Sequence, residues 1–269
     1  NLRGGAGNDV INGGTQGVGG LDQASYFEDP NGVIVNLSTG VGFDGYGDVD
    51  TLSNIERLSG SDFADILIGD AGNNELLGNF GADYLDGGAG SDTATYFFRT
   101  GLGVTANLTT GRAIDKGGAT DTLVNIENLT GGDGNDTLTG DSGVNTIDSG
   151  KGTDIIFASA GNDLLIGGFG GSSSSEFNQF DYSAGTSPLT VNMGVFDAFG
   201  TATSAEFGTD IIKVADRIIG GTGNDVFTAG TLHSGNFGTF IVFEGLGGND
   251  TITGNGNTRV EYRQSPGVT

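Results

Sequence analysis

The sequence contains no cysteine, no tryptophan, one histidine, three prolines and only ten basic residues among its 269 positions. Without cysteine it forms no disulfide bonds, and bound metal ions could serve as cross-links in their place. A chain with one histidine cannot carry the H-E-x-x-H motif of zinc proteases. The scarcity of lysine and arginine argues against a nucleic-acid partner. No apolar run is long enough to form a transmembrane helix.

Glycine and acidic residues are abundant instead. The 54 glycines and 34 acidic residues give a formal net charge of −24. Such a composition normally indicates disorder, because glycine loses much backbone entropy on folding and carboxylates repel one another. Hydrophobic residues nevertheless make up 35% of the chain and recur at fixed places. We therefore expect a folded chain that needs cations, and about eight to ten divalent ions, one per acidic turn, would nearly cancel its charge.

A nine-residue pattern, G-G-x-G-x-D-x-U-x with U a large aliphatic residue, recurs with variation along the chain. Its glycines permit a tight turn, its aspartate places a carboxylate at the same point of every turn, and its last three residues form a minimal strand with one inward side chain. Such short units must stack on one another to bury apolar surface. The clearest copies are Gly131–Thr139, Gly4–Asn12, Gly87–Thr95 and Gly220–Thr228.

These nonapeptides resemble the calcium-binding repeats of the hemolysin-type RTX family. The resemblance implies an all-β fold, a right-handed parallel β-roll or β-helix solenoid of tandem modules that Ca²⁺ stabilises. It also implies that consecutive nonapeptides alternate between the two sides of the roll, with one ion between turns n and n+2. The chemistry agrees, because Ca²⁺ takes six to eight oxygen ligands and glycine-rich turns expose their carbonyl groups.

The resemblance also names candidate metal ligands. The acidic-position residues are Asp9, Asp65, Asn74, Asp83, Asp92, Asp136, Asn145, Asp154, Asp163, Asp225 and Asp250, and the turn glycines are Gly87, Gly90, Gly131, Gly134, Gly220 and Gly223. The n, n+2 rule joins Asp65 to Asp83, Asn74 to Asp92, Asp136 to Asp154 and Asn145 to Asp163. We expect weaker or empty sites at the two asparagines, which lack a charge. Asp225 and Asp250 lack intact neighbours in the sequence, which leaves their metal binding open.

A longer period lies above the nonapeptide. Similar segments end at Tyr26, Tyr96, Tyr182 and Tyr262, which are separated by 70, 86 and 80 residues. We expect these tyrosines to pack in the core or at joints between modules. The predicted organisation is the end of a preceding roll at 1–25, modules at 26–95, 96–181 and 182–261, and the start of a further module at 262–269. The chain is then expected to be part of a larger protein.

Each module also carries a short alternating strand, such as 33–37, a variable loop, and a second hydrophobic block. The blocks begin at Asp50, Asp121 and Asp210. Apolar residues recur at every third position of a block, which fits either a helical turn or short strands joined by β-arcs. We favour strands, because each block runs directly into nonapeptides. Aromatic residues of the variable loops are candidates for partner contacts, namely Phe43, Tyr46, Phe196 and Phe199.

The sequence favours a structural, non-enzymatic role. The acidic residues are mostly assigned to calcium, and the single histidine, His233, is interpreted as a loop residue. We expect a calcium-binding segment of a large extracellular or cell-surface bacterial protein, such as an adhesin stalk, a surface-layer subunit or a filament. By family resemblance, it would leave the cell by type I secretion and fold on Ca²⁺ outside. Self-association or neighbouring repeats, and surface polysaccharide, are the expected partners. The alternatives are the C-terminal RTX region of a secreted enzyme (epimerase, lipase or protease) or of an RTX toxin.

Overall fold

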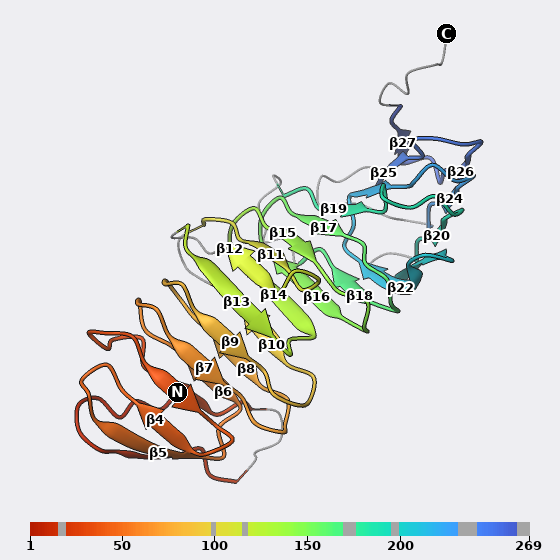
Figure 1. Cartoon of the computed structure of the whole chain (residues 1–269). Coiled ribbons are helices and arrows are strands. Elements are labelled where there is room, and N and C mark those ends of the chain that lie inside the picture. Colours follow the sequence, from red (N-terminus) through yellow and green to blue (C-terminus); the bar gives the residue numbers. More distant parts are fainter. Residues whose placement is uncertain are drawn as a thin grey trace. The chain divides into compact units, whose positions relative to one another are not determined.

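The computed structural model describes residues 1–15, 20–97, 101–114, 118–168, 176–194, 199–230 and 241–262. All regular structure in these residues is β, in 27 short strands without a helix (Figure 1). The expected all-β fold is therefore confirmed. In the described part of the chain no helix offers a stretch suited to crossing a membrane.

The chain forms two compact units. Unit 1 comprises Asn1–Arg99 and Gly103–Thr130, and unit 2 comprises Thr100–Leu102 and Gly131–Thr269. These units do not correspond to the modules expected from the tyrosine spacing, whose boundaries stay a prediction. Each unit contains two sheets, called sheet I and sheet II below.

In unit 1, sheet I has the strand order β1-β5-β4-β3-β7-β9-β13-β12-β11 and sheet II has the order β2-β6-β8-β10-β14. The strands of sheet I are β1 (Val10–Asn12), β3 (Ile34–Asn36), β4 (Val41–Phe43), β5 (Val49–Ser53), β7 (Ile66–Ile68), β9 (Tyr84–Asp86), β11 (Thr105–Asn107), β12 (Arg112–Ile114) and β13 (Thr120–Val124). Those of sheet II are β2 (Gln23–Ser25), β6 (Arg57–Ser59), β8 (Glu75–Leu77), β10 (Thr93–Thr95) and β14 (Asn128–Gly132).

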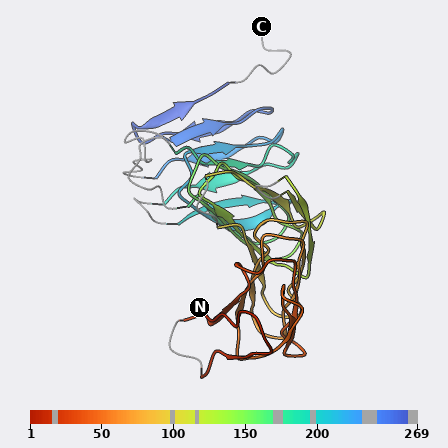
Figure 2. The same ribbon diagram turned by 90° about the vertical axis from the view of Figure 1, so that its left-hand side faces the viewer.

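In unit 2, sheet I has the order β15-β17-β19-β23-β25-β27 and sheet II has the order β16-β18-β22-β21-β20-β24-β26. The strands of sheet I are β15 (Thr137–Thr139), β17 (Ile155–Phe157), β19 (Gln179–Asp181), β23 (Arg217–Ile219), β25 (Ile241–Glu244) and β27 (Thr258–Val260). Those of sheet II are β16 (Thr146–Gly150), β18 (Leu164–Ile166), β20 (Thr190–Asn192), β21 (Gly200–Ser204), β22 (Gly208–Lys213), β24 (Val226–Thr228) and β26 (Thr251–Thr253). The blue and cyan strands of this unit stack as successive coils (Figure 2).

Nonapeptide strands alternate between the sheets, as the family resemblance implies. Strands β7 and β9 pair in parallel in sheet I, and β8 and β10 pair in parallel in sheet II. Two nonapeptides therefore make one coil, and each residue lies beside the residue 18 positions later, as Leu67 does beside Leu85. The inward apolar residue of each repeat, such as Leu67, Leu76 or Leu85, is fully buried and forms the core between the sheets.

The second hydrophobic blocks are strands joined by tight bends, so the helical alternative is wrong. In the first block Leu52 lies in β5 and Leu58 lies in β6, while Ile55 lies between them and is also buried. Asn54, just before Ile55, has a φ of 53°, a left-handed conformation that asparagine tolerates better than most residues. The bend explains why apolar residues spaced three positions apart all face the core.

Candidate metal centre

The acidic-position residues form ladders along each unit of the roll. The backbone N–H of Asp65 donates to Oδ1 of Asp83 at 2.9 Å, and that of Asn74 donates to Oδ1 of Asp92 at 2.7 Å. In unit 2 the N–H of Asp136 donates to Asp154. The structure thus brings together the residues that the n, n+2 rule pairs. Asn145 and Asp163 make the fourth such pair, at 2.9 Å.

Asp225 and Asp250 also form such a pair, although the sequence left them without intact neighbours. The N–H of Asp225 donates to Oδ1 of Asp250 at 2.9 Å over a separation of 25 residues. Strands β24 and β26 pair in parallel here, with β25 taking its place in the other sheet. The alternation of strands therefore resumes after the interruption, and Asp225 and Asp250 add a pair to the ladders.

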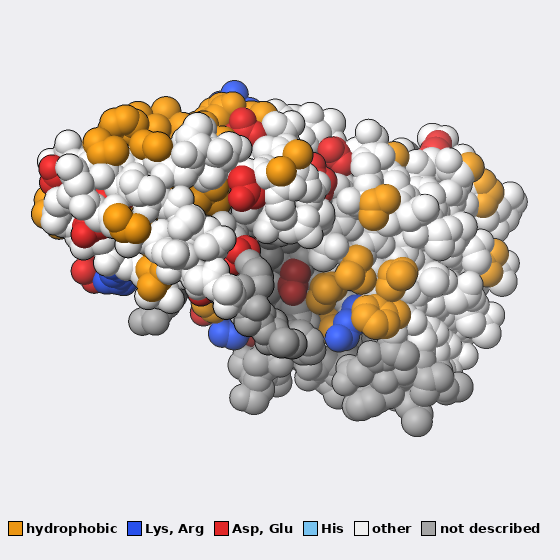
Figure 3. Space-filling view, turned by 90° about the horizontal axis from the view of Figure 1, so that it is seen from below, with side chains coloured by type: hydrophobic (Ala, Val, Ile, Leu, Met, Phe, Trp, Pro, Cys, Tyr) orange, Lys and Arg blue, Asp and Glu red, His pale blue; other side chains and the backbone are white. Residues whose placement is uncertain are grey.

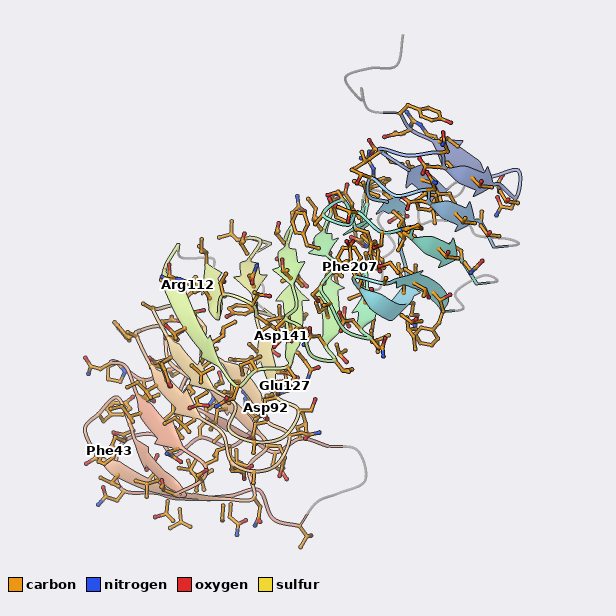
Figure 4. All side chains as sticks on the ribbon, turned by 45° about the vertical axis from the view of Figure 1, so that its right-hand side comes forward. Phe43, Asp92, Arg112, Glu127, Asp141 and Phe207 are labelled. Carbon is orange, nitrogen blue, oxygen red and sulfur yellow. The ribbon has the colours of Figure 1, made fainter. Side chains whose placement is uncertain are left out.

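Several residues outside the nonapeptides also join the ladders. The N–H groups of Asp9, Asp83 and Asp163 donate to Oδ1 of Asp50, Asp121 and Asp210, the first residues of the three hydrophobic blocks. Glu127 accepts from the N–H of Asp92 in the same way, and the two lie together in Figure 4. Asn178 accepts from the N–H of Asp154. The sequence feature that could have identified Asp50, Asp121 and Asp210 as ladder residues is that each hydrophobic block begins with an aspartate.

The first glycine of each turn makes room for the carboxylate. A Cβ on Gly87 would lie 2.6 Å from Oδ2 of Asp92, and one on Gly4 would lie 2.7 Å from Oδ2 of Asp9. Likewise, Oδ2 of Asp136 leaves no room for a Cβ on Gly131, and Oδ2 of Asp225 leaves none on Gly220. Glycine at this position therefore allows the aspartate carboxylate to pack against the backbone of its own turn.

In several turns the glycine at the fourth position brings successive coils into close approach. Gly90 has a φ of 138°, and a Cβ there would lie 2.6 Å from the carbonyl oxygen of Gly72 in the neighbouring coil. In the same way, a Cβ on Gly152 would clash with the carbonyl oxygen of Gly134, and one on Gly248 would clash with that of Gly223. A column of backbone oxygens therefore runs beside the ladder of carboxylates.

Buried carboxylate oxygens without a hydrogen-bond donor lie in these ladders. Oδ2 of Asp9, Asp92 and Asp154 is buried and accepts no hydrogen bond. Asp92 and Asp154 are themselves almost fully buried. A buried, unpaired carboxylate is unfavourable unless a cation or a proton compensates it.

The pKa values of these groups reflect the same burial. Burial raises the pKa of Asp65 to about 6 and that of Asp154 to about 7. It also raises the pKa of Asp92, Asp163 and Asp225 above the usual range. At such sites the protonated, neutral carboxyl group is favoured over the carboxylate. A bound cation would favour the carboxylate and lower the pKa again.

The donor set suits a large oxygen-binding cation. No group of three or more acidic, histidine or cysteine side chains that could hold a metal lies within the described residues. A site in these ladders must therefore combine one or two carboxylates with backbone carbonyl oxygens, which is the mixture that Ca²⁺ accepts. His233 and Phe196 lie outside the described residues.

Comparison with known proteins agrees with this geometry. The family described as "RTX calcium-binding nonapeptide repeat (4 copies)" matches residues 1–16, 59–94, 125–156, 139–171, 215–231 and 242–258. None of the curated proteins matches the chain. The matched ranges cover most of the ladder residues, and the repeats of this family bind calcium. By its coils, its ladders and its matched repeats, the chain belongs to the RTX calcium-binding nonapeptide repeat family.

Proposed function

We propose that the ladders hold calcium ions between successive coils, with the acidic-position residues and the carbonyl groups of their turns as ligands. The observation that best supports this is the buried Oδ2 of Asp92 and of Asp154, which accepts no hydrogen bond. A cation between coils would compensate these oxygens and offset the formal charge of −24. Binding would then be coupled to folding, because the coils that form the site exist only in the folded chain.

The ladder positions that carry asparagine should bind calcium more weakly. Oδ1 of Asn74 accepts the N–H of Asp70, and Oδ1 of Asn145 accepts the N–H of Asp141. The Asn145 amide also donates to Oδ1 of Asp141 at 3.0 Å. These amides contribute no charge, and part of their hydrogen-bonding capacity is already used within their own turns.

The biological role that fits best is a calcium-stiffened segment of a large extracellular or cell-surface protein. RTX repeats typically occur in secreted proteins, and extracellular modules bind Ca²⁺ at about 10⁻⁴ to 10⁻³ M. Such a chain would stay extended at the low calcium concentration inside a cell and fold after export. The RTX region of a secreted enzyme or toxin is the second candidate, and a catalytic domain in the parent protein would decide for it.

A calcium titration with ion counting tests the metal sites. Circular dichroism should show a coil-to-β transition as Ca²⁺ rises to millimolar concentration, and Mg²⁺ should not replace it because it requires smaller octahedral sites. The variant Asp154→Asn should lower the number of bound ions. The matched control Asp62→Asn removes the same charge from an exposed residue and should not. A chain that is fully folded in a chelator, or equal ion counts for both variants, would refute the proposal.

We further propose that unit 1 associates with a second copy through an uncharged face of sheet I. Outward-facing residues of five adjacent strands include no charged side chain, although 16% of the whole chain is charged. Figure 3 shows hydrophobic side chains gathered at the upper left, and Phe43, which lies in β4 between β3 and β5, is labelled in Figure 4. The face consists of Val10, Asn12, Ile34, Asn36, Val41, Phe43, Val49, Thr51, Ser53, Ile66 and Ile68.

The third hairpin shows that the fold does not need apolar residues here. Phe43 pairs with Ile34 and with Val49, and all three are about half exposed. The equivalent row in the β20–β21–β22 hairpin consists of threonines. A second copy suits the face because two such faces can approach without opposing carboxylates, whereas a basic partner would find no charge to pair with.

Sedimentation velocity in calcium tests this contact. A variant in which Ile34, Phe43 and Val49 are all changed to threonine copies the row of the third hairpin and should keep the calcium transition. The unchanged protein should associate with increasing concentration, and the variant should not. An unchanged protein that stays monomeric at all concentrations would refute the contact without affecting the metal sites.

A further inference from the structure

Three buried tyrosines make the same contact in three places. The hydroxyl groups of Tyr26, Tyr96 and Tyr182 donate to Oδ2 of Asp50, Asp121 and Asp210, at 3.1, 3.2 and 2.8 Å. All six residues are nearly inaccessible to solvent. These are the tyrosines that mark the longer period of the sequence, and the aspartates begin the hydrophobic blocks.

Each of these aspartates is also the last member of a ladder that begins in nonapeptides. Oδ1 of Asp121 accepts the N–H of Asp83 at 3.0 Å, just as Oδ1 of Asp83 accepts the N–H of Asp65. Asp210 follows Asp163 in the same way, at 3.0 Å. Their Oδ1 atoms therefore act like those of the nonapeptide aspartates, and only the surroundings of Oδ2 differ.

The fold provides space for the tyrosine hydroxyl in each case. The residue opposite the aspartate in the antiparallel hairpin is small, because Gly42 pairs with Asp50, Ala113 with Asp121 and Ala202 with Asp210. A Cβ on Gly42 would lie 2.8 Å from the hydroxyl oxygen of Tyr26. In the nonapeptides the space beside Oδ2 comes instead from the first glycine of the turn, and Oδ2 of Asp92 there has no donor.

We propose that three of the calcium ladders end at a tyrosine–aspartate pair whose phenolic hydrogen takes the place of a cation. Asp50, Asp121 and Asp210 then bind no calcium, although they stand in line with residues that do. A neutral hydroxyl group satisfies one carboxylate oxygen without needing further ligands, whereas Ca²⁺ would need several more oxygens. The tyrosines thus act as positioning residues that fix where each ladder stops. The inference rests on the proposed calcium function.

Ion counting on matched variants tests the proposal. Asp83→Asn and Asp121→Asn change adjacent members of one ladder, and asparagine keeps the Oδ1 acceptor in both. Asp83→Asn should lower the number of bound Ca²⁺ ions by at least one, and Asp121→Asn should leave it unchanged. An equal loss in both variants would overturn the proposal while leaving the calcium function intact. No loss in Asp83→Asn would instead contradict the calcium assignment.

Removing the hydroxyl group provides a second readout. Tyr96→Phe leaves the buried Asp121 without this donor and should lower the melting temperature in saturating calcium by about 3 to 10 °C, at an unchanged ion count. Tyr84→Phe removes a hydroxyl from the outer side of sheet I and is the matched control, with little expected change. In the Asp121→Asn background, Tyr96→Phe should lower the melting temperature by less than it does in the unchanged protein. Equal melting temperatures for Tyr96→Phe and the unchanged protein would remove the tyrosine from this role.

Discussion

Replacing Gly90 by alanine tests whether the roll depends on close contact between its coils. Gly90 has a φ of 138°, and its absent Cβ would lie 2.6 Å from the carbonyl oxygen of Gly72 and 2.9 Å from the carbonyl carbon. Both atoms belong to the backbone, so no side-chain rotation can relieve the contact. Either the two coils must separate or the turn of Gly90 must change its conformation.

The size of the effect follows from two contributions. A residue other than glycine in this backbone region costs about 1–3 kcal/mol. Overpacking that forces a backbone shift typically costs about 1–3 kcal/mol more. The Gly72 carbonyl also belongs to the column of oxygens proposed to bind calcium, so the calcium midpoint should rise as well.

Gly47→Ala separates the two contributions. Gly47 has a φ of 96°, and a Cβ there would meet nothing within 4 Å, so only the conformational cost applies. In saturating calcium we expect Gly90→Ala to be less stable than Gly47→Ala by about 1–3 kcal/mol, or about 2–12 °C in melting temperature. Thermal unfolding followed by circular dichroism measures the difference. Equal losses in the two variants would refute the idea that coil contact, and not only φ, selects glycine at the fourth position.

Three further variants or conditions test the core, the buried ion pair and the carboxylates. Leu85→Ala removes a fully buried side chain and should cost about 2–5 kcal/mol in calcium-loaded protein, whereas Ile66→Ala on the exposed side should cost much less; denaturant unfolding compares them. Arg217→Met leaves the buried carboxylate of Glu244 without its ion-pair partner and should cost about 3–5 kcal/mol; a melting temperature within 2 °C of the unchanged protein would contradict this. Without calcium, burial raises the pKa of Asp154 to about 7, so the folded chain retains a proton that the unfolded chain releases near pH 4. This contribution is complete below pH 4 and is lost as pH rises through 7, so the calcium-free protein should show more β-structure at pH 5 than at pH 8, and calcium should bind more weakly at pH 5.

The nonapeptide ladders could be predicted because their period is built into the chain. Two nine-residue repeats make one coil, so residues 18 apart must meet once the strands alternate between two sheets. Asp65 and Asp83 are such a pair. The glycines follow from the same geometry, since a Cβ on Gly87 at the first position would meet the carboxylate of its own turn and one on Gly90 at the fourth would meet the backbone of the neighbouring coil.

The ends of the ladders could not be predicted in this way. Asp9 and Asp50 are 41 residues apart, Asp83 and Asp121 are 38 apart, and Asp163 and Asp210 are 47 apart. In each case a hairpin is inserted into the coil, and its length hides the register from any fixed period. Only their shared position at the start of a repeated block indicated that Asp50, Asp121 and Asp210 have the same role.

The pairing of Asp225 with Asp250 was missed for a related reason. Residues 229–244 between them keep no nonapeptide, so no repeat predicts a strand there. The core decides the outcome instead, because Phe227 and Phe243 are buried side chains that pack 5.0 Å apart between ring centres. Burial of β25 in the opposite sheet restores the alternation and brings Asp250 into register.

Strict alternation also determines which sheet receives each hairpin. In unit 1, five single strands, β6 to β10, separate β5 from β11, and both hairpins therefore belong to sheet I. Adding or removing eighteen residues of nonapeptide would preserve this arrangement, whereas a change of nine would transfer the next hairpin to the other sheet. The hairpins supply the aspartates of the tyrosine–aspartate pairs and the exposed rows that differ between them. The number of nonapeptides in a run therefore determines the side on which the next hairpin displays its exposed row, and under the proposed function it would also determine how many calcium ions the run binds.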